Sequence, residues 1–226
     1  MPQRFRGADR IVCFRRIACI TCGRYSPRVK QGKWETISSE RHFANAHLEV
    51  VTDHVRTASR LQPRAWTIVH RKAAVIIAPM TRDGKVVLIR QERIPIRETI
   101  WEMPSGQIDT GAEGGHAAET IEQVALRELR EEAGYQLAED GELIALGQYF
   151  SSPGFTDERG YLFLARPVAR CSEKPQCDEG ESILDCREFS FEELRRMISK
   201  NEIRDANTLG ICARLAARGF LSLDPR

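Results

Sequence analysis

The central helix of this chain ends in RELREEAGY, residues 127–135, and the rest of the fold is predicted around that stretch. Thr120 is a suitable N-cap residue, and Gln123 follows it at the spacing of a capping box. Gly134 suits the position just after a helix, where the backbone turns left-handed. These signals predict one amphipathic helix between Thr120 and Gly134.

Three carboxylates crowd the last turn of this helix. At about 100° per residue, Glu128, Glu131 and Glu132 project within roughly a 100° arc. The negative end of the helix dipole disfavours them, and like charges at i,i+4 repel. They border the apolar side of the helix, which carries Ile121 and Val124, so a solvated acidic face fits poorly. A hard cation such as Mg²⁺ would remove both penalties, and the spacing therefore indicates a metal site.

The composition indicates an ordinary globular protein. The 226 residues are 42% apolar and 29% charged, which suits one domain with an extension. No apolar run approaches the roughly 20 residues of a membrane span, so no membrane partner is expected. The seven cysteines form no repeating frame and no secretory signal is visible, which favours a reduced, cytoplasmic setting.

The basic residues are concentrated in residues 1–33. This head holds nine Lys or Arg and one acid, whereas the remainder holds 25 basic and 31 acidic residues. An acidic body argues against nucleic acid as a partner. We expect a basic, disordered tail, with an organelle transit segment or an RNA-directed arm as alternatives. Cys19 and Cys22 form a lone pair without a second ligand pair, so no zinc site is predicted.

Short strands and late helices surround the central helix. Residues 47–56 and 65–70, separated by the Pro63 break, predict a small N-terminal β-hairpin within an extension of residues 34–66. Further strands are expected at 73–78, 85–91, 99–103, 142–150, 160–165 and 182–189, with a turn at Asp83-Gly84 and helices at about 190–200 and 205–219. This order indicates a mixed sheet covered by helices.

The stretch of the opening resembles the signature of the Nudix hydrolases, G-x5-E-x7-R-E-U-x-E-E-x-G-U, in which U is a bulky apolar residue. Glu119, seven intervening residues and residues 127–135 match without a gap. The glycine does not match, because Glu113 occupies its position and Gly106 lies seven residues earlier. We interpret this as an insertion in the loop before the helix, with Glu119 rather than Glu113 as the signature glutamate.

The resemblance extends beyond the signature to the ADP-ribose pyrophosphatase branch. WEMPSGQID at 101–109 resembles its E-x-P-A-G-x-I-D lead-in, SPGFTDE at 152–158 its S-P-G loop, and DEGE at 178–181 its later acidic loop. The resemblance implies an α/β (α+β) fold, a Nudix-like α/β/α sandwich with a mixed sheet at residues 67–220. The small hairpin would precede it.

The resemblance also implies a metal site. Glu128 and Glu132 match the main carboxylate ligands, and Glu131 matches a residue that shares a second ion. The backbone carbonyl of Ser105 matches a further ligand, and Arg127 matches an arginine that orients the glutamates by pairing with Glu119. The implied cofactor is Mg²⁺, with Mn²⁺ as a substitute.

The substrate residues follow from the same resemblance. Arg93 matches an arginine that holds a phosphate, and Ser152 and Glu158 match the loop that cradles the terminal ribose. Glu179 or Glu181 matches the loop that approaches the attacking water as base or as a further ligand.

The expected reaction is Mg-dependent hydrolysis of ADP-ribose, or a related nucleoside-diphosphate sugar, to a nucleoside monophosphate and a sugar phosphate. The alternatives are hydrolysis of a dinucleotide or another nucleoside diphosphate derivative, and a Nudix module that binds a nucleotide without cleaving it. A homodimer is also implied, because the resembling branch pairs through its N-terminal strands.

Overall fold

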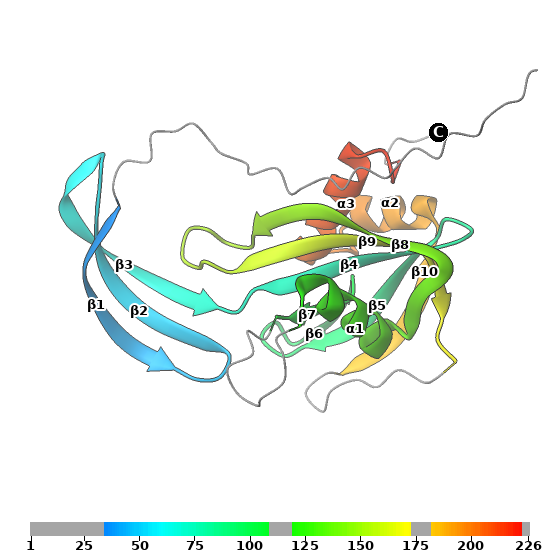
Figure 1. Ribbon diagram of the computed structural model, residues 1–226, viewed down its shortest axis with the longest axis horizontal. Helices are drawn as coiled ribbons and strands as arrows, with labels where there is room; N and C mark the ends of the chain where they lie inside the picture. The colour runs from blue at the N-terminus through cyan, green and yellow to red at the C-terminus, as the bar shows by residue number, and fades with distance from the viewer. Residues whose placement is uncertain (1–33, 109–118, 173–181, 223–226) are drawn as a thin grey trace, which may run out of the picture.

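The computed structural model describes residues 34–108, 119–172 and 182–222, which form two β-sheets and three helices (Figure 1). The N-terminal sheet is antiparallel, in the order β1-β2-β3. Its strands are β1 (Glu35–Ala44), β2 (Leu48–Thr57) and β3 (Arg60–Arg71). In Figure 1 this sheet stands out to the left of the main body.

The predicted N-terminal hairpin is confirmed as the pair of β2 and β3, and the structure adds β1 as a third strand that was not predicted. Every residue of β1 is exposed, so its sequence carries no alternation of buried and exposed residues, and pairing with β2 is what makes it a strand. Pro63 does not break β3, because it lies at the edge of the sheet beside a register shift, where no ladder hydrogen bond from nitrogen is needed.

The main sheet has seven strands, five of them in the order β10-β5-β4-β9-β8. The pairing of β4 with β9 is parallel and the other pairings are antiparallel, which confirms the mixed sheet. The strands are β4 (Ala74–Thr81), β5 (Val86–Arg93), β6 (Glu98–Glu102), β7 (Ser105–Gln107), β8 (Tyr135–Phe150), β9 (Arg159–Arg170) and β10 (Ile183–Phe189). The predicted start of β8 at residue 142 is wrong, because the strand begins directly after the helix at Tyr135 and contains a register shift between Leu137 and Glu142.

The hairpin of β4 and β5 opens away from its turn, and this opening shapes the site. Only Met80 and Val86 pair between the two strands. Farther along, β6 pairs with β5 and β7 pairs with β4, so the segment from β6 to β7 lines the opening. The amide of Ile77 donates to the carbonyl oxygen of Pro104 at 2.9 Å, which fixes the link between β6 and β7.

The helices cover both faces of the main sheet. The central helix, α1 (Ile121–Ala133), packs on one face, and α2 (Phe191–Ser199) and α3 (Ala206–Ala217) pack on the other (Figure 1). Strand β4 shows the alternation: Val75 and Ile77 face α1, whereas Ile76 and Ala78 face α2 and α3. Each large aliphatic side chain buried this way contributes about 1.5–3 kcal/mol. The predicted α/β/α sandwich is thus confirmed.

The N-terminal sheet joins the main body through the end of β3. The amide of Val69 donates to the carbonyl of Phe155 at 2.8 Å, and Trp66 Nε1 donates to the carbonyl of Gly154 at 3.1 Å. The predicted boundary at residues 66 and 67 falls inside β3 and stays a prediction, as does the tail at 1–33, which lies outside the described residues. Of the helices described, none is long and apolar enough to cross a membrane.

Candidate active site

Helix α1 begins and ends where its capping residues predict. Thr120 accepts a hydrogen bond from the Gln123 amide at 3.2 Å, and the Gln123 side chain accepts from the Thr120 amide at 2.8 Å. Gly134 adopts the left-handed conformation at φ 68° and closes the helix. Because both ends are fixed by local hydrogen bonds, the helix presents Glu128 and Glu132 to the sheet.

The carboxylates of α1 are buried to different degrees. Glu128 is 6% and Glu132 is 2% exposed, whereas the side chain of Glu131 is 34% exposed. Buried carboxylates are rare unless they are paired or bind a cation. The helical pattern placed these carboxylates at the border of the buried side of α1, and the structure agrees. Glu128 and Glu132 are the two that are buried.

Strand β7 supplies a close-fitting cradle for these two side chains. The Ser105 amide donates to Glu132 Oε2 at 2.7 Å. A Cβ atom on Gly106 would lie 2.0 Å from Glu128 Cδ, a distance that no real contact allows. The glycine is therefore required for close approach of the Glu128 carboxylate to the backbone.

Arg127 joins the three glutamates that surround it. Its Nε lies 3.2 Å from Glu119, its Nη2 lies 2.9 Å from Glu128 Oε1, and its Nη1 donates to Glu131 Oε2 at 2.7 Å. Burial lowers the pKa of Arg127, but these carboxylates raise it more, so it lies above its ordinary value. The pair between Arg127 and Glu119 that the resemblance implies is present.

The donor atoms at this end of α1 suit a hard cation. They are carboxylate oxygens of Glu128, Glu131 and Glu132, with the backbone of Ser105 beside them, and Mg²⁺ prefers oxygen ligands. In the described part of the chain, no three acidic, histidine or cysteine side chains are grouped tightly enough to enclose an ion. The residues fit Mg²⁺ in type and cradle, and two of the three helix carboxylates, Glu128 and Glu131, contact Arg127 in this structure.

A cavity of about 850 Å³ opens beside these carboxylates. Glu128, Arg127 and the backbone of β7 form its helix side, and the ends of β5 and β6 form its strand side. Arg71 and Lys72 line it next to the N-terminal sheet, and the start of α3 from Asp205 closes it. Its walls carry both charges: the cations are Arg71, Lys72, Arg93, Arg127 and Arg204, and the anions are Glu102, Glu128, Glu158 and Asp205.

Arg93 is fixed on the strand side by a buried carboxylate. Its Nε donates to Glu102 Oε1 at 2.9 Å and its Nη2 donates to Glu102 Oε2 at 2.9 Å. Glu102 is 2% exposed, and burial raises its pKa although Arg93 lowers it. Burial lowers the pKa of Arg93, but Glu102 raises it more, so the guanidinium stays charged in the cavity wall.

Glu158 and Ser152 lie on the same loop but in different settings. Glu158 lines the cavity, accepts a hydrogen bond from Ser151 Oγ at 2.7 Å and pairs with Arg71 at 3.0 Å. Ser152 does not line the cavity, and its carbonyl closes the turn to the amides of Phe155 and Thr156. The structure therefore brings Glu158 together with Arg93 and Glu128 around one cavity, whereas Ser152 is not among the residues that line it.

Two predicted site residues are not described by the structure, and two residues of the cavity were not predicted. Glu179 and Glu181 lie outside the described residues. Glu102 and Arg71 were not predicted from the sequence. A glutamate between two apolar residues of the WEMPSG lead-in, in a strand with an arginine nearby, was the available signal for Glu102. Arg71 carried no signal beyond its charge.

Comparisons with known proteins agree with this geometry. A family model described as the NUDIX domain matches residues 69–209. An ADP-ribose pyrophosphatase of Bacillus subtilis (strain 168) is 30% identical over 174 residues, covering 77% of this chain and 88% of that protein. A methanol dehydrogenase activator of Bacillus methanolicus is 30% identical over 175 residues, with 77% and 88% coverage.

A solved structure supports the same fold. The crystal structure of an ADP compounds hydrolase superposes with a TM-score of 0.67 at 18% sequence identity, covering 84% of this chain and 98% of that one. At this identity the likeness concerns the fold only.

Proposed function

This chain belongs to the Nudix hydrolase family, and on that premise we propose that it hydrolyses the pyrophosphate of ADP-ribose or a related nucleoside-diphosphate sugar. The observation that carries the proposal is the pair of buried glutamates on α1: Glu128 packs against Gly106 and lines a cavity with Arg93, and Glu132 accepts a hydrogen bond from the Ser105 amide. The relative named ADP-ribose pyrophosphatase, similar over most of both chains, supports this substrate class.

We assign the cation to Glu128, Glu132 and Glu131 with the Ser105 carbonyl. When bound there, Mg²⁺, or Mn²⁺ in its place, supplies neutralisation of phosphate charge and lowers the pKa of a bound water. In the reaction, water adds to one phosphorus and the bridging P–O bond breaks. The products are a nucleoside monophosphate and a sugar phosphate, and two protons are released when both products are dianions.

The remaining residues bind and orient the substrate. Arg93, fixed by Glu102, donates charge-assisted hydrogen bonds to a phosphate. Glu158, held by Ser151 and Arg71, accepts from sugar hydroxyls, and Ser152 supports the same loop. Arg127 orients Glu119, Glu128 and Glu131, since each of its nitrogens contacts a different one of these glutamates. Glu179 or Glu181 remains our proposal for the base.

The test is a panel of nucleoside-diphosphate sugars and dinucleotides, assayed with Mg²⁺ for release of the monophosphate. We expect ADP-ribose, or a close analogue, to give the highest kcat/KM, and chelation of divalent cations to abolish turnover. The variant Glu132→Gln should fold and should lose activity by orders of magnitude. Near-wild-type turnover in that variant would contradict the metal site. Faster cleavage of dinucleotides than of nucleoside-diphosphate sugars would show that dinucleotides are the substrate class.

We also propose a homodimer and a cytoplasmic setting. The exposed side chains of the N-terminal sheet, Trp34, Ile37, Phe43, Leu61 and Trp66, support association of two chains through it. Sedimentation of the full chain tests the dimer, and a monomer at micromolar concentration would contradict it.

A further inference from the structure

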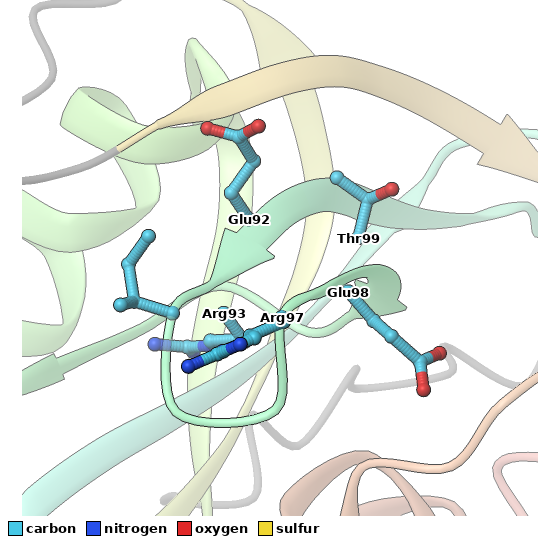
Figure 2. A pocket seen from close by; sticks show the side chains of 6 residues that line it. Glu92, Arg93, Arg97, Glu98 and Thr99 are labelled. Carbon is cyan, nitrogen blue, oxygen red and sulfur yellow. The ribbon is translucent and has the colours of Figure 1, made fainter.

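A second hollow lies on the far side of Arg93 from the carboxylate cavity. Its volume is about 530 Å³, and it is formed by the turn that joins β5 to β6 (Figure 2). Arg93 lines both spaces, so the two hollows meet at this residue. Arg97 lines the second hollow, and in Figure 2 both arginines extend into the loop of the turn.

The backbone of the turn is held in a costly conformation that places Arg97 here. Arg97 has φ 54°, in the left-handed region, which costs a residue with a side chain roughly 1–2 kcal/mol. Two hydrogen bonds hold it there, from the Arg97 amide to the carbonyls of Arg93 at 2.9 Å and Ile94 at 3.2 Å. Such strained positions cluster at ligand-binding sites, where surrounding structure fixes them.

The two glutamates that line this hollow contact residues outside it. Glu98 pairs with Arg204, and Glu92 accepts a hydrogen bond from Ser182 Oγ at 2.6 Å. Glu102 binds Arg93 through Nε and Nη2, which leaves Nη1 of Arg93 to other partners. Within residues 34–108, 119–172 and 182–222, no carboxylate forms an ion pair with Arg97. Arg97 therefore brings to the hollow a positive charge that no described carboxylate pairs with, although Glu92 and Glu98 also line it.

We propose that this hollow is an anion subsite that binds a phosphate monoester, with Arg97 as its main ligand-binding residue. A guanidinium presents a rigid fork of donors that matches a phosphate, and the exposed position of Arg97 lets it bind without displacing a carboxylate. Arg93 lines both the subsite and the carboxylate cavity. A substrate whose pyrophosphate contacts Arg93 can therefore place an additional phosphate, outside the pyrophosphate, against Arg97. This substrate preference rests on the proposed function, whereas phosphate binding itself does not.

The first test measures binding of inorganic phosphate to the full chain by calorimetry, without divalent cations. We expect Arg97→Gln to weaken binding about tenfold, and Arg97→Lys to weaken it less because it keeps the charge. Arg90→Gln is the matched control, because Arg90 is an exposed arginine of β5 outside this turn. The phosphate affinity of this variant should stay within twofold of the wild-type value. Equal affinity in wild type and Arg97→Gln would overturn the subsite.

A glycine variant separates binding from structure. Glycine adopts φ 54° without strain, so Arg97→Gly should keep or raise the thermal midpoint and still lose phosphate affinity. A lower midpoint with unchanged affinity would mean that Arg97 serves only the turn, and would overturn the proposal.

The second test distinguishes a phosphate on the substrate from free phosphate. ADP-ribose and its 2′-phosphate form a matched pair that differs in one phosphate. If the substrate carries the anion, Arg97→Gln should raise KM about tenfold for the phosphorylated compound and less than twofold for ADP-ribose. If KM is unchanged for both while phosphate affinity is lost, the subsite takes free phosphate. If wild type cleaves neither compound, the proposed function fails and the calorimetric result still decides the subsite.

Discussion

The two sides of the cavity hold their arginines in opposite ways. On the helix side, Arg127 divides its nitrogens among three glutamates and its side chain is 31% exposed. On the strand side, Arg93 gives two nitrogens to one carboxylate, Glu102, which is 2% exposed. The first arrangement is shared among three carboxylates, and the second is one bidentate pair between a buried carboxylate and an arginine whose side chain is 39% exposed.

This difference indicates which side can rearrange when a ligand binds. The pairs of Arg127 with Glu119 and Glu131 are partly exposed and worth little by themselves, so these two carboxylates can release Arg127 at small cost. Breaking the pair between Arg93 and Glu102 would leave a buried carboxylate uncompensated, which costs more than losing an exposed pair, so Arg93 stays where Glu102 holds it. We infer that the helix side adapts to the metal and that the strand side is a fixed template for phosphate.

The largest effect is expected on the helix side, at the buried ligands. Glu128→Gln keeps the shape but removes the negative charge, so kcat should fall at least about a hundredfold with Mg²⁺. Glu131→Gln should cost less, because Glu131 is more exposed and contacts Arg127 rather than β7. Steady-state kinetics of both variants at several Mg²⁺ concentrations checks this order. A larger loss in Glu131→Gln would reverse the assignment of primary and auxiliary ligands.

The next effect comes from the cradle that fixes Glu128. In Gly106→Ala the new methyl group would lie 2.0 Å from Glu128 Cδ, so the carboxylate has to move. We expect kcat to fall by roughly tenfold to a hundredfold and stability to fall by about 1–3 kcal/mol. Urea unfolding and kinetics measure both. Gly210→Ala is the control, because nothing lies within 4 Å of a Cβ there. Unchanged kinetics in Gly106→Ala would show that the helix side does not need its carboxylate in this position.

On the strand side, Glu102→Gln should act on substrate affinity. Glutamine still accepts one hydrogen bond but no longer balances the charge of Arg93. The guanidinium can then turn from its fixed position, and we expect KM to rise about tenfold with a smaller change in kcat. Glu142→Gln, which loses the exposed pair with Arg166, should leave both constants within twofold. If kcat fell far more than KM rose, Glu102 would belong to the reacting groups and not to the positioning of Arg93.

The same contrast explains how much the sequence could predict. The helix side is specified by local sequence signals. Thr120, Gln123 and Gly134 cap the helix through contacts within a few residues, and helical spacing places the carboxylates on one side of it. The strand side depends on register. Glu102 lies opposite Ile89 and reaches Arg93 only because β6 pairs antiparallel with the end of β5. That pairing joins segments whose order in the sheet the residues do not specify.

Other missed features share this non-local cause. Gly106 is visible in the sequence as the displaced signature glycine, and only the packed structure identifies Glu128 as its close neighbour. Strand β1 has no buried side chain to mark it. The hydrogen bond to Glu158 comes from Ser151 and not from Ser152, a one-residue difference that depends on the loop's path.

The smallest effect tests whether the start of α1 contributes to its catalytic end. Thr120→Ala removes the acceptor for the Gln123 amide and should lower stability by about 1 kcal/mol. Ser190→Ala is the matched variant, because Ser190 caps α2 through the same capping box with Glu193. Both variants should unfold at lower urea by similar amounts, and both should keep kcat and KM within twofold. The reason is that Glu128 and Glu132 are held at the other end of α1 by β7, about two turns away. A fall in kcat in Thr120→Ala without one in Ser190→Ala would mean that the adaptable helix side depends on its whole length, through Glu119 beside the cap and its contact with Arg127.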